Sequence, residues 1–477
     1  MKVGLISPRG TERNQQNNIF FEIYKNLLPV VSFMIDDIEF IPNLGLLQIG
    51  AYLDDRFDVK YIDEDYIDIS TSEPVIFDEE FDLVCLSACN NQAFRAYEIA
   101  DKYREMGKTV VIGGFHPSAL PHEAKQHADA VVIGEGEDTF PVLIEDWLKG
   151  ELKPFYYSSG DVDLTKIPMP RYDAIGNITR FNKMPVFATR GCPRFCDYCC
   201  IKTLYGPRYR KKTIQQVVDE INELKRLYPR PYPFITFGDE NLLADPEWSK
   251  ELVRALIDLN IRWECYCDMA VADDDELLEL LYESRCTELL IGFESVIPET
   301  LKHNAPWKAK RVHEYAKAIE KIQSHGIGIM GLFIVGFDQD GPDVFDRISE
   351  FIRETNLFDI DFAVLCPIPG TRVYDRFKAE GRILTENWNK YTWLHVNFQP
   401  KQMTPRELQE GLIRLFKEFS TIEMLEKRRK YFRNIYQRLA GENPPKFKFE
   451  QAYLKPEDFI KGKTEDKAGK SITVKSS

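Results

Sequence analysis

The 477-residue chain lacks any apolar run long enough to cross a bilayer. Its longest such run, residues 327–337, contains three glycines and is about half the ~20 residues that a membrane helix needs. An excess of basic charge is also missing: 62 lysines and arginines against 76 acidic residues give a net charge of −14, which disfavours bulk nucleic-acid binding. Ten cysteines form no disulfide framework in a chain of this length, and the amino terminus reads as a strand rather than a signal peptide. We therefore expect a reducing, cytoplasmic location.

Three closely spaced cysteines are the most informative feature present. Cys192, Cys196 and Cys199 stand in the stretch Gly-Cys-Pro-Arg-Phe-Cys-Asp-Tyr-Cys, directly after a short apolar strand. Iron–sulfur clusters normally take four thiolates, so three ligands would leave one iron of a [4Fe–4S] cluster open. An open metal position can bind and activate a small molecule. The alternatives are a zinc knuckle, with Cys200 as a fourth ligand, or simply buried thiols.

The first 150 residues alternate between strand-like and helix-like segments. Expected strands cover residues 2–7, 59–63, 83–87, 109–113 and 130–133, and expected helices cover 44–53, 93–106 and 138–148. This order predicts an α/β fold with a doubly wound, Rossmann-like parallel sheet, whose ligands bind beyond the carboxyl ends of the strands. The alternative is that those ends only form tight turns. Candidate binding residues there are Ser7, Pro8, Arg9, Ser87, Asn90, Gly113, Gly114, His116, Gly134, Glu135 and Gly136.

A proline-bearing segment, residues 151–183, predicts a linker, and a second α/β run follows it. Its strands are expected near residues 186–189, 234–238, 263–269, 289–294, 328–335 and 361–365, with helices between them. Six strand–helix units are too few for a closed eight-fold barrel and favour a partial (β/α)6 barrel over residues 184–400. The cysteine loop falls at the carboxyl end of the first strand, where barrel active sites lie.

With both runs placed, the chain resembles a class B radical S-adenosylmethionine (SAM) enzyme with an amino-terminal cobalamin-binding domain at residues 1–150. Residues 42–53, 110–118, 128–137 and 367–371 carry the resemblance together with the cysteine loop. It implies that Cys192, Cys196 and Cys199 hold a [4Fe–4S] cluster. It further implies a SAM pocket formed by Tyr198, Gly238, Asp239, Glu240, Asn241, Glu294 and Ser295, although the acids among these are also typical helix caps. Cobalamin would bind without a histidine on cobalt, because the segment after the first strand has none.

The resemblance implies a radical mechanism in which a 5′-deoxyadenosyl radical removes hydrogen from an inert carbon and methylcobalamin delivers a methyl group. The expected function is therefore methyl transfer to an unactivated carbon of a small-molecule or lipid substrate, with an electron donor such as flavodoxin or ferredoxin. Alternatives are a radical cyclase or rearrangement enzyme of the Mg-protoporphyrin ester cyclase type, and a non-catalytic iron–sulfur protein. The sequence does not identify the substrate.

Beyond residue 400 the sequence predicts a helical extension to residue 462 and a disordered tail at 463–477. Its second helix carries the basic run 427–430 followed by aromatics. This helix either packs its aromatics on the barrel, or forms a lid or a contact with an acidic or membrane-borne substrate. Cys265 and Cys267 share one face of a strand. They are either small buried thiols or, if that face looks into the barrel, a hydrogen donor or a second metal site.

Overall fold

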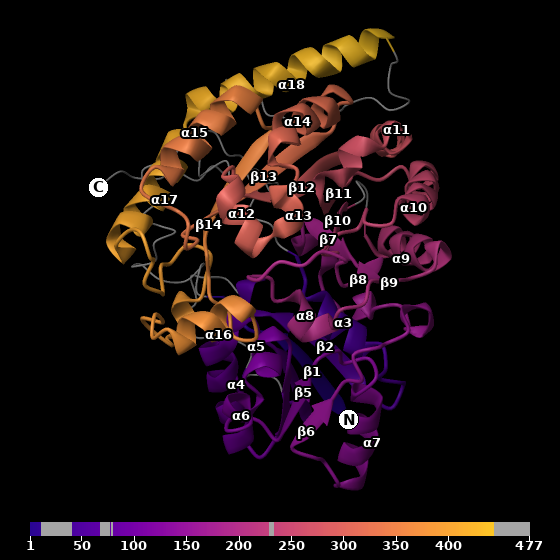
Figure 1. The fold of residues 1–477 in the computed structure, drawn as a ribbon. Helices are drawn as coiled ribbons and strands as arrows, with labels where there is room; N and C mark the ends of the chain where they lie inside the picture. The colour runs from indigo at the N-terminus through magenta and orange to yellow at the C-terminus, as the bar shows by residue number, and fades with distance from the viewer. Residues whose placement is uncertain (11–40, 67–76, 78–79, 229–232, 443–477) are drawn as a thin grey trace, which may run out of the picture.

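The computed structural model describes residues 1–10, 41–66, 77, 80–228 and 233–442. Figure 1 shows two α/β bodies stacked on one another, with the amino-terminal one in indigo and the second in magenta to orange. The long helix α18 (Ile422–Glu442), in yellow, crosses the end of the second body that lies away from the first.

The first body is a six-stranded parallel sheet in the order β2-β1-β3-β4-β5-β6. Alternate side chains pack on opposite faces: helices α3 (Leu44–Gly50) and α7 (Phe140–Lys149) cover one face, and α4 (Ala93–Glu105) covers the other. The doubly wound sheet is thus confirmed. Its strands are β1 (Lys2–Ser7), β2 (Asp58–Asp63), β3 (Leu83–Ser87), β4 (Thr109–Gly113), β5 (Ala130–Ile133) and β6 (Phe155–Tyr157).

Strand β6 was not predicted, because it lies in the segment expected to be a linker. Phe155 to Tyr157 pair in parallel with Val131 to Ile133 of β5 and so extend the first sheet by one edge strand. Three residues are too short for alternation to be visible in the sequence. The rest of residues 158–182 contains only short 3-10 turns.

The second body is a six-stranded parallel sheet in the order β14-β13-β12-β11-β10-β7, with β14 and β7 at its edges, as an open partial barrel requires. The first strand begins earlier than expected, and residues 189–190 instead form β8 (Thr189–Arg190), which pairs antiparallel with β9 (Arg210–Lys211). The six strands are β7 (Lys183–Val186), β10 (Phe234–Phe237), β11 (Trp263–Cys267), β12 (Cys286–Glu294), β13 (Gly328–Val335) and β14 (Asp359–Val364). Its main helices are α9 (Ile214–Leu227), α10 (Pro246–Leu259), α11 (Asp275–Glu283), α14 (Tyr315–Ser324) and α15 (Val344–Thr355).

The carboxyl-terminal region is helical, as predicted. Helix α17 (Pro405–Phe419) begins with a capping box between Thr404 and Glu407 and packs Phe416 on Phe362 of β14. Helix α18 buries Phe432 against Phe358 and donates a hydrogen bond from Tyr436 to the Gly326 carbonyl. Because Gly326 precedes the amino end of β13, α18 lies at the end of the barrel opposite the cysteine loop and is not a lid over it. Residues 443–477, including the tail expected to be disordered, lie outside the described residues.

Among the described residues, no helix is both long and apolar enough to cross a membrane.

The shorter helices are α5 (Phe115–Ala119), α6 (Pro121–Ala124), α8 (Ile201–Tyr205), α12 (Pro298–Asn304), α13 (Pro306–Ala309) and α16 (Arg372–Ala379).

Candidate active site between the two sheets

The three cysteines lie together on the loop that connects β8 to α8, at the carboxyl end of β7. Cys192, Cys196 and Cys199 are all partly buried. Burial raises the pKa of each thiol, to about 12 for Cys199, so that near neutral pH the thiols stay protonated until a metal displaces the proton. Such sulfurs suit iron, which binds cysteine as the thiolate.

No three His, Cys, Asp or Glu side chains in the described part of the chain converge as the ligands of a single ion would. A [4Fe–4S] cluster does not require this, because each thiolate binds a different iron. The adjacent Cys200 is partly buried as well, and burial raises its pKa to about 12.

The strand end that was predicted to hold SAM supports the cysteine loop. The Asp239 carboxylate is fully buried and accepts hydrogen bonds from the backbone N–H groups of Ala188 and Thr189 and from the Thr189 hydroxyl. Glu240 accepts a bond of 3.0 Å from the Gly191 N–H, and burial raises its pKa to about 7. The carboxylate oxygens of Asp239 already accept hydrogen bonds from the chain. The geometry therefore makes Asp239 a support of the cysteine loop rather than a ligand of SAM.

Asn241, from the same strand end, is directed at the first cluster cysteine. Its Nδ2 lies 3.8 Å from the Cys192 sulfur and donates to Asp268 at 2.9 Å, while the Asp268 N–H donates back to Asn241 at 3.2 Å. Gly238 lines the cavity described below, and a Cβ atom there would meet the Phe187 ring at 2.8 Å. Only glycine therefore lets Phe187 pack over this strand end.

Glu294 forms an ion pair that the sequence did not reveal. It has a left-handed backbone (φ 63°) at a bulge in β12, and its carboxylate lies 2.5 Å from the Lys308 ammonium. Lys308 also donates to the Gly292 carbonyl at 2.6 Å. Burial opposes its charge, but the Glu294 carboxylate raises the pKa of Lys308. A carboxylate and an ammonium side by side near a cluster cysteine offer both charges that the amino-acid end of SAM requires.

Two further predicted SAM residues lie around the same loop, Tyr198 partly buried and Ser295 fully buried. The Tyr198 ring packs edge-on against Phe337, which follows β13, with centroids 5.6 Å apart. Ser295 is fully buried, and its hydroxyl accepts a hydrogen bond of 3.1 Å from the Ile297 N–H. Both residues lie close to the cysteine loop, as the prediction requires, but the Ser295 hydroxyl already accepts a hydrogen bond within its own turn.

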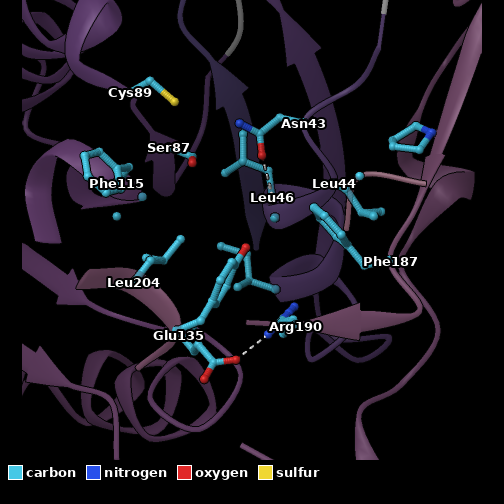
Figure 2. Close-up of a pocket in the computed structure, with 18 of the residues that line it drawn as sticks. Asn43, Leu44, Leu46, Ser87, Cys89, Phe115, Glu135, Phe187, Arg190 and Leu204 are labelled. Carbon is cyan, nitrogen blue, oxygen red and sulfur yellow. Dashed lines mark hydrogen bonds and ion pairs between the residues drawn. The ribbon is translucent and has the colours of Figure 1, made fainter. Parts of the chain in front are cut away.

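A cavity of about 410 Å³ lies between the carboxyl ends of the two sheets. Figure 2 shows Leu46, Phe187 and Leu204 on different sides of it, with Arg190 reaching Glu135. Its wall takes Thr236, Gly238, Glu264, Tyr266 and Leu290 from the second sheet. From the predicted cobalamin set it takes Ser87, Gly113, Gly114, Gly134, Glu135 and Gly136.

Five predicted cobalamin residues do not line this cavity: Ser7, Pro8, Arg9, Asn90 and His116. The His116 ring is fully buried, with Asn90 at 3.1 Å from one nitrogen and the Tyr97 hydroxyl at 3.0 Å from the other. Pro8 and Arg9 bond through their backbones to Gln92 and Glu64. These contacts hold turns and do not support the assignment of Asn90, His116, Pro8 and Arg9 to cobalamin.

Cys265 and Cys267 share a face of β11 as predicted, but that face packs into the core with Trp263 and not into the barrel. The side chains on the opposite face of β11, Glu264 and Tyr266, line the cavity instead. A role for the two thiols as hydrogen donors or metal ligands inside the barrel is therefore wrong.

The residues around the cavity fit a cobalamin. Gly114 has a left-handed backbone (φ 97°), and a Cβ there would lie 2.8 Å from the Ser87 hydroxyl, so only glycine lets this strand end pack closely against the end of β3 at the cavity wall. The wall is largely apolar, and the buried Arg190 Nε has no acceptor in the described part of the chain. An amide-bearing ligand could supply one. The cavity volume of about 410 Å³ is typical of sites for small molecules. A whole cobalamin is larger than such a molecule and would also extend outside the cavity.

Two family models match the chain: "B12 binding domain" over residues 39–144 and "Radical SAM superfamily" over residues 186–352. The bacteriochlorophyllide d C-12(1)-methyltransferase of Chlorobaculum tepidum is 30% identical over 392 residues, which cover 81% of this chain and 84% of the relative. The C-8(2)-methyltransferase of the same organism is 28% identical, over 76% of this chain and 82% of the relative.

The fold is also similar to that of OxsB, a cobalamin-dependent SAM radical enzyme solved with aqua-cobalamin and SAM. The TM-score is 0.67 at 17% identity, covering 92% of this chain and 71% of OxsB. The chain therefore belongs to the radical SAM enzymes with an amino-terminal cobalamin-binding domain. It is a radical SAM enzyme with a cobalamin-binding domain, and both relatives named above are methyltransferases. The expectation from the sequence is confirmed, and the non-catalytic alternative is wrong.

Proposed function

We propose that this enzyme methylates an unactivated carbon of an organic molecule that has a large apolar part and binds between the two sheets. The observation that carries the proposal is the shared cavity, whose wall comes from the carboxyl ends of both sheets. In this proposal residues 1–150 form the cobalamin domain and residues 184–400 the radical SAM domain.

Each cofactor would be held by a different set of side chains. Cys192, Cys196 and Cys199 would bind the cluster, and the Glu294–Lys308 pair would meet the ammonium and carboxylate of SAM. The glycine-bearing ends of β4 and β5 would hold cobalamin. When bound, these groups supply radical generation and a transferable methyl group, while the protein orients the partners and excludes water.

The inner face of the second sheet favours an apolar substrate. Tyr266 and Leu290 line the cavity on neighbouring strands, and the next residue in the same row, Met330 of β13, is partly exposed. Leu332 and Ile334 continue this partly exposed apolar surface along β13. Relatives that act on bacteriochlorophyllide d suggest a tetrapyrrole, and a lipid satisfies the same apolar surface.

The enzyme also needs a source of electrons, and we propose an acidic one-electron donor of the flavodoxin or ferredoxin kind. Phe195, inside the cysteine loop, is 43% exposed, and the Lys202 ammonium and Arg372 guanidinium lie 3.4 and 4.3 Å from its ring centre. Contact with a membrane surface would instead use Lys427, Lys430 and Arg433, which are exposed on α18 at the opposite end of the barrel.

The test is the product spectrum of anaerobically reconstituted protein with SAM, methylcobalamin and cell extract separated into lipid-soluble and aqueous fractions. We expect S-adenosylhomocysteine and 5′-deoxyadenosine together, and a product one methylene heavier in the lipid-soluble fraction. Deoxyadenosine alone would favour cyclisation or rearrangement, whereas the two relatives named above are methyltransferases. A methylated product only in the aqueous fraction would contradict the apolar substrate.

A further inference from the structure

A buried ion-pair bridge joins the loop that follows β5 to the start of the cysteine loop. Arg190 stands two positions before Cys192, and its NH1 lies 2.7 Å from the Glu135 carboxylate while its NH2 binds Glu137. The exposed fractions of these side chains are only 7%, 1% and 5%. Arg210 of β9 lies 2.7 Å from the second oxygen of Glu135. Three buried charges and the partly buried Arg210 thus meet where the first body contacts the second.

Stability alone does not explain this bridge. Removing charges from water costs several kcal/mol per ion, and apolar side chains of similar volume are often as stabilising as a buried ion pair. An ion pair of defined geometry does, however, fix one segment relative to another. The planar guanidinium of Arg190 reaches two carboxylates of a single loop, which specifies both its distance and its orientation.

The opposite side of the same short segment is fastened to the second sheet. Asp239 accepts hydrogen bonds from Ala188 and Thr189, and Glu240 accepts one from Gly191. Residues 188–191 are therefore held between the end of β10 and the loop that follows β5. A displacement of that loop would be passed to Cys192 through Arg190.

We propose that Arg190 is a positioning residue that couples the cobalamin loop, residues 134–137, to the cluster loop. Occupation of the cavity and ligation of the cluster then stabilise one another, as any coupling between two sites must be reciprocal. This inference rests on the assignment of the two sites proposed above. Glu135 was predicted to contact cobalamin; in this proposal its carboxylate holds Arg190 in place.

The test measures the rate at which a chelator removes iron from the reconstituted protein, with and without saturating hydroxocobalamin. In the wild type, saturating cobalamin should slow iron loss, because opening of the cluster loop would require the occupied cobalamin loop to move as well. Arg190→Met and Glu137→Gln should lose this protection at cobalamin concentrations that saturate each variant. Arg190→Lys keeps the charge but reaches only one carboxylate, so it should retain a part of the protection.

Arg95→Met is the matched control. The Arg95 guanidinium also pairs with a buried carboxylate, Glu64 at 2.6 Å, but both residues belong to the first body. This variant should keep the full protection even if its melting temperature falls. Full protection in Arg190→Met, or in both Arg190→Lys and Glu137→Gln should Arg190→Met fail to fold, overturns the coupling. A wild type that binds no cobalamin or no iron contradicts the site assignment instead.

Discussion

At the scale of single residues, the candidate site is built from groups that are costly to bury alone. Burial raises the pKa of the three cysteine thiols, and Glu294 and Lys308 form an ion pair with little access to water. A cysteine gains its partner only when the cluster binds, whereas Glu294 and Lys308 already pair with each other. Substitution of a cysteine should therefore affect ligand binding more than folding, while breaking the ion pair should also lower stability, because it leaves one buried charge unpaired.

The first prediction concerns the cysteines. Cys192→Ala, Cys196→Ala and Cys199→Ala should each abolish the iron-based chromophore or SAM cleavage, because a cluster needs all three thiolates when its fourth iron is left open. Cys200→Ala is the matched control, since this neighbouring thiol is buried to a similar degree. It should retain SAM cleavage; equal loss in this variant would mean that the open-iron arrangement is wrong. Iron content and deoxyadenosine formation are the measurements.

The second prediction concerns the charge pair. Glu294→Gln and Lys308→Met should each weaken SAM binding by roughly one to two decades, since a hydrogen bond to a charged group contributes about 1.5–3 kcal/mol. Iron content should stay unchanged. Glu299→Gln is the control, because this acid pairs with Lys302 on the exposed surface of the neighbouring helix. Calorimetric titration of SAM measures the affinities, and unchanged values in both variants would remove the pair from the site.

At the scale of elements, the ends of the barrel strands are held by buried acids that act as acceptors. Asp340 accepts hydrogen bonds from the Gly336 and Phe337 N–H groups after β13 and from the Thr300 hydroxyl of α12. Phe337 in turn packs on Tyr198 of the cysteine loop. A turn far from the cysteines in sequence thereby contributes to the shape of the site.

The third prediction follows from the ionisation of Asp340. Burial raises its pKa from 3.8 to about 6, so between these values the folded state binds more protons than the unfolded state. The contribution of Asp340 to stability is therefore full below pH 4 and decreases as the pH rises to about 6. Asp340→Asn keeps the hydrogen bonds, because its amide can donate to Thr300, but it does not titrate.

Urea unfolding of both proteins between pH 4 and 8 measures this effect. The free energy of unfolding of Asp340→Asn relative to wild type should rise with pH by at most roughly 3 kcal/mol. A difference that does not vary with pH would show that the carboxyl group keeps an ordinary pKa.

At the scale of the whole molecule, the two sheets are arranged so that their carboxyl ends share one cavity. A ligand that binds there contacts both bodies, and its binding energy adds to the stability of each. Cofactor binding and interdomain order are therefore expected to change together.

The fourth prediction tests this arrangement by hydrogen exchange. Hydroxocobalamin at about 100 times its dissociation constant should stabilise the protein by about 2.7 kcal/mol. It should slow exchange in both β4 and β10. In Gly114→Ala, hydroxocobalamin should neither stabilise the protein nor slow exchange, because the added Cβ would clash with Ser87 and Ala88 at the strand end. Gly150→Ala, at a left-handed glycine with open space around it, is the matched control and should keep it. Protection confined to β4 would contradict a cavity shared by both sheets.

The sequence by itself determined the fold class, the order of the two bodies and the cysteine loop. Apolar periodicity marks strands and helices wherever they are long, and the spacing of Cys192, Cys196 and Cys199 is a local property of one loop. The glycines at the ends of β4 and β5 were likewise visible, because glycine is needed where the backbone is left-handed or closely approached.

Only the tertiary structure decided which polar side chains meet across the molecule. Arg190 and Glu137 are 53 positions apart, and neither sequence segment contains a pattern that predicts their contact. Asp239 and His116 stand at strand ends, as a ligand-binding residue would, yet their polar atoms are taken up by the chain. The direction of a side chain depends on packing against distant segments. Whether the face of β11 that carries Cys265 points into the barrel or into the core is therefore determined by the helices that cover it.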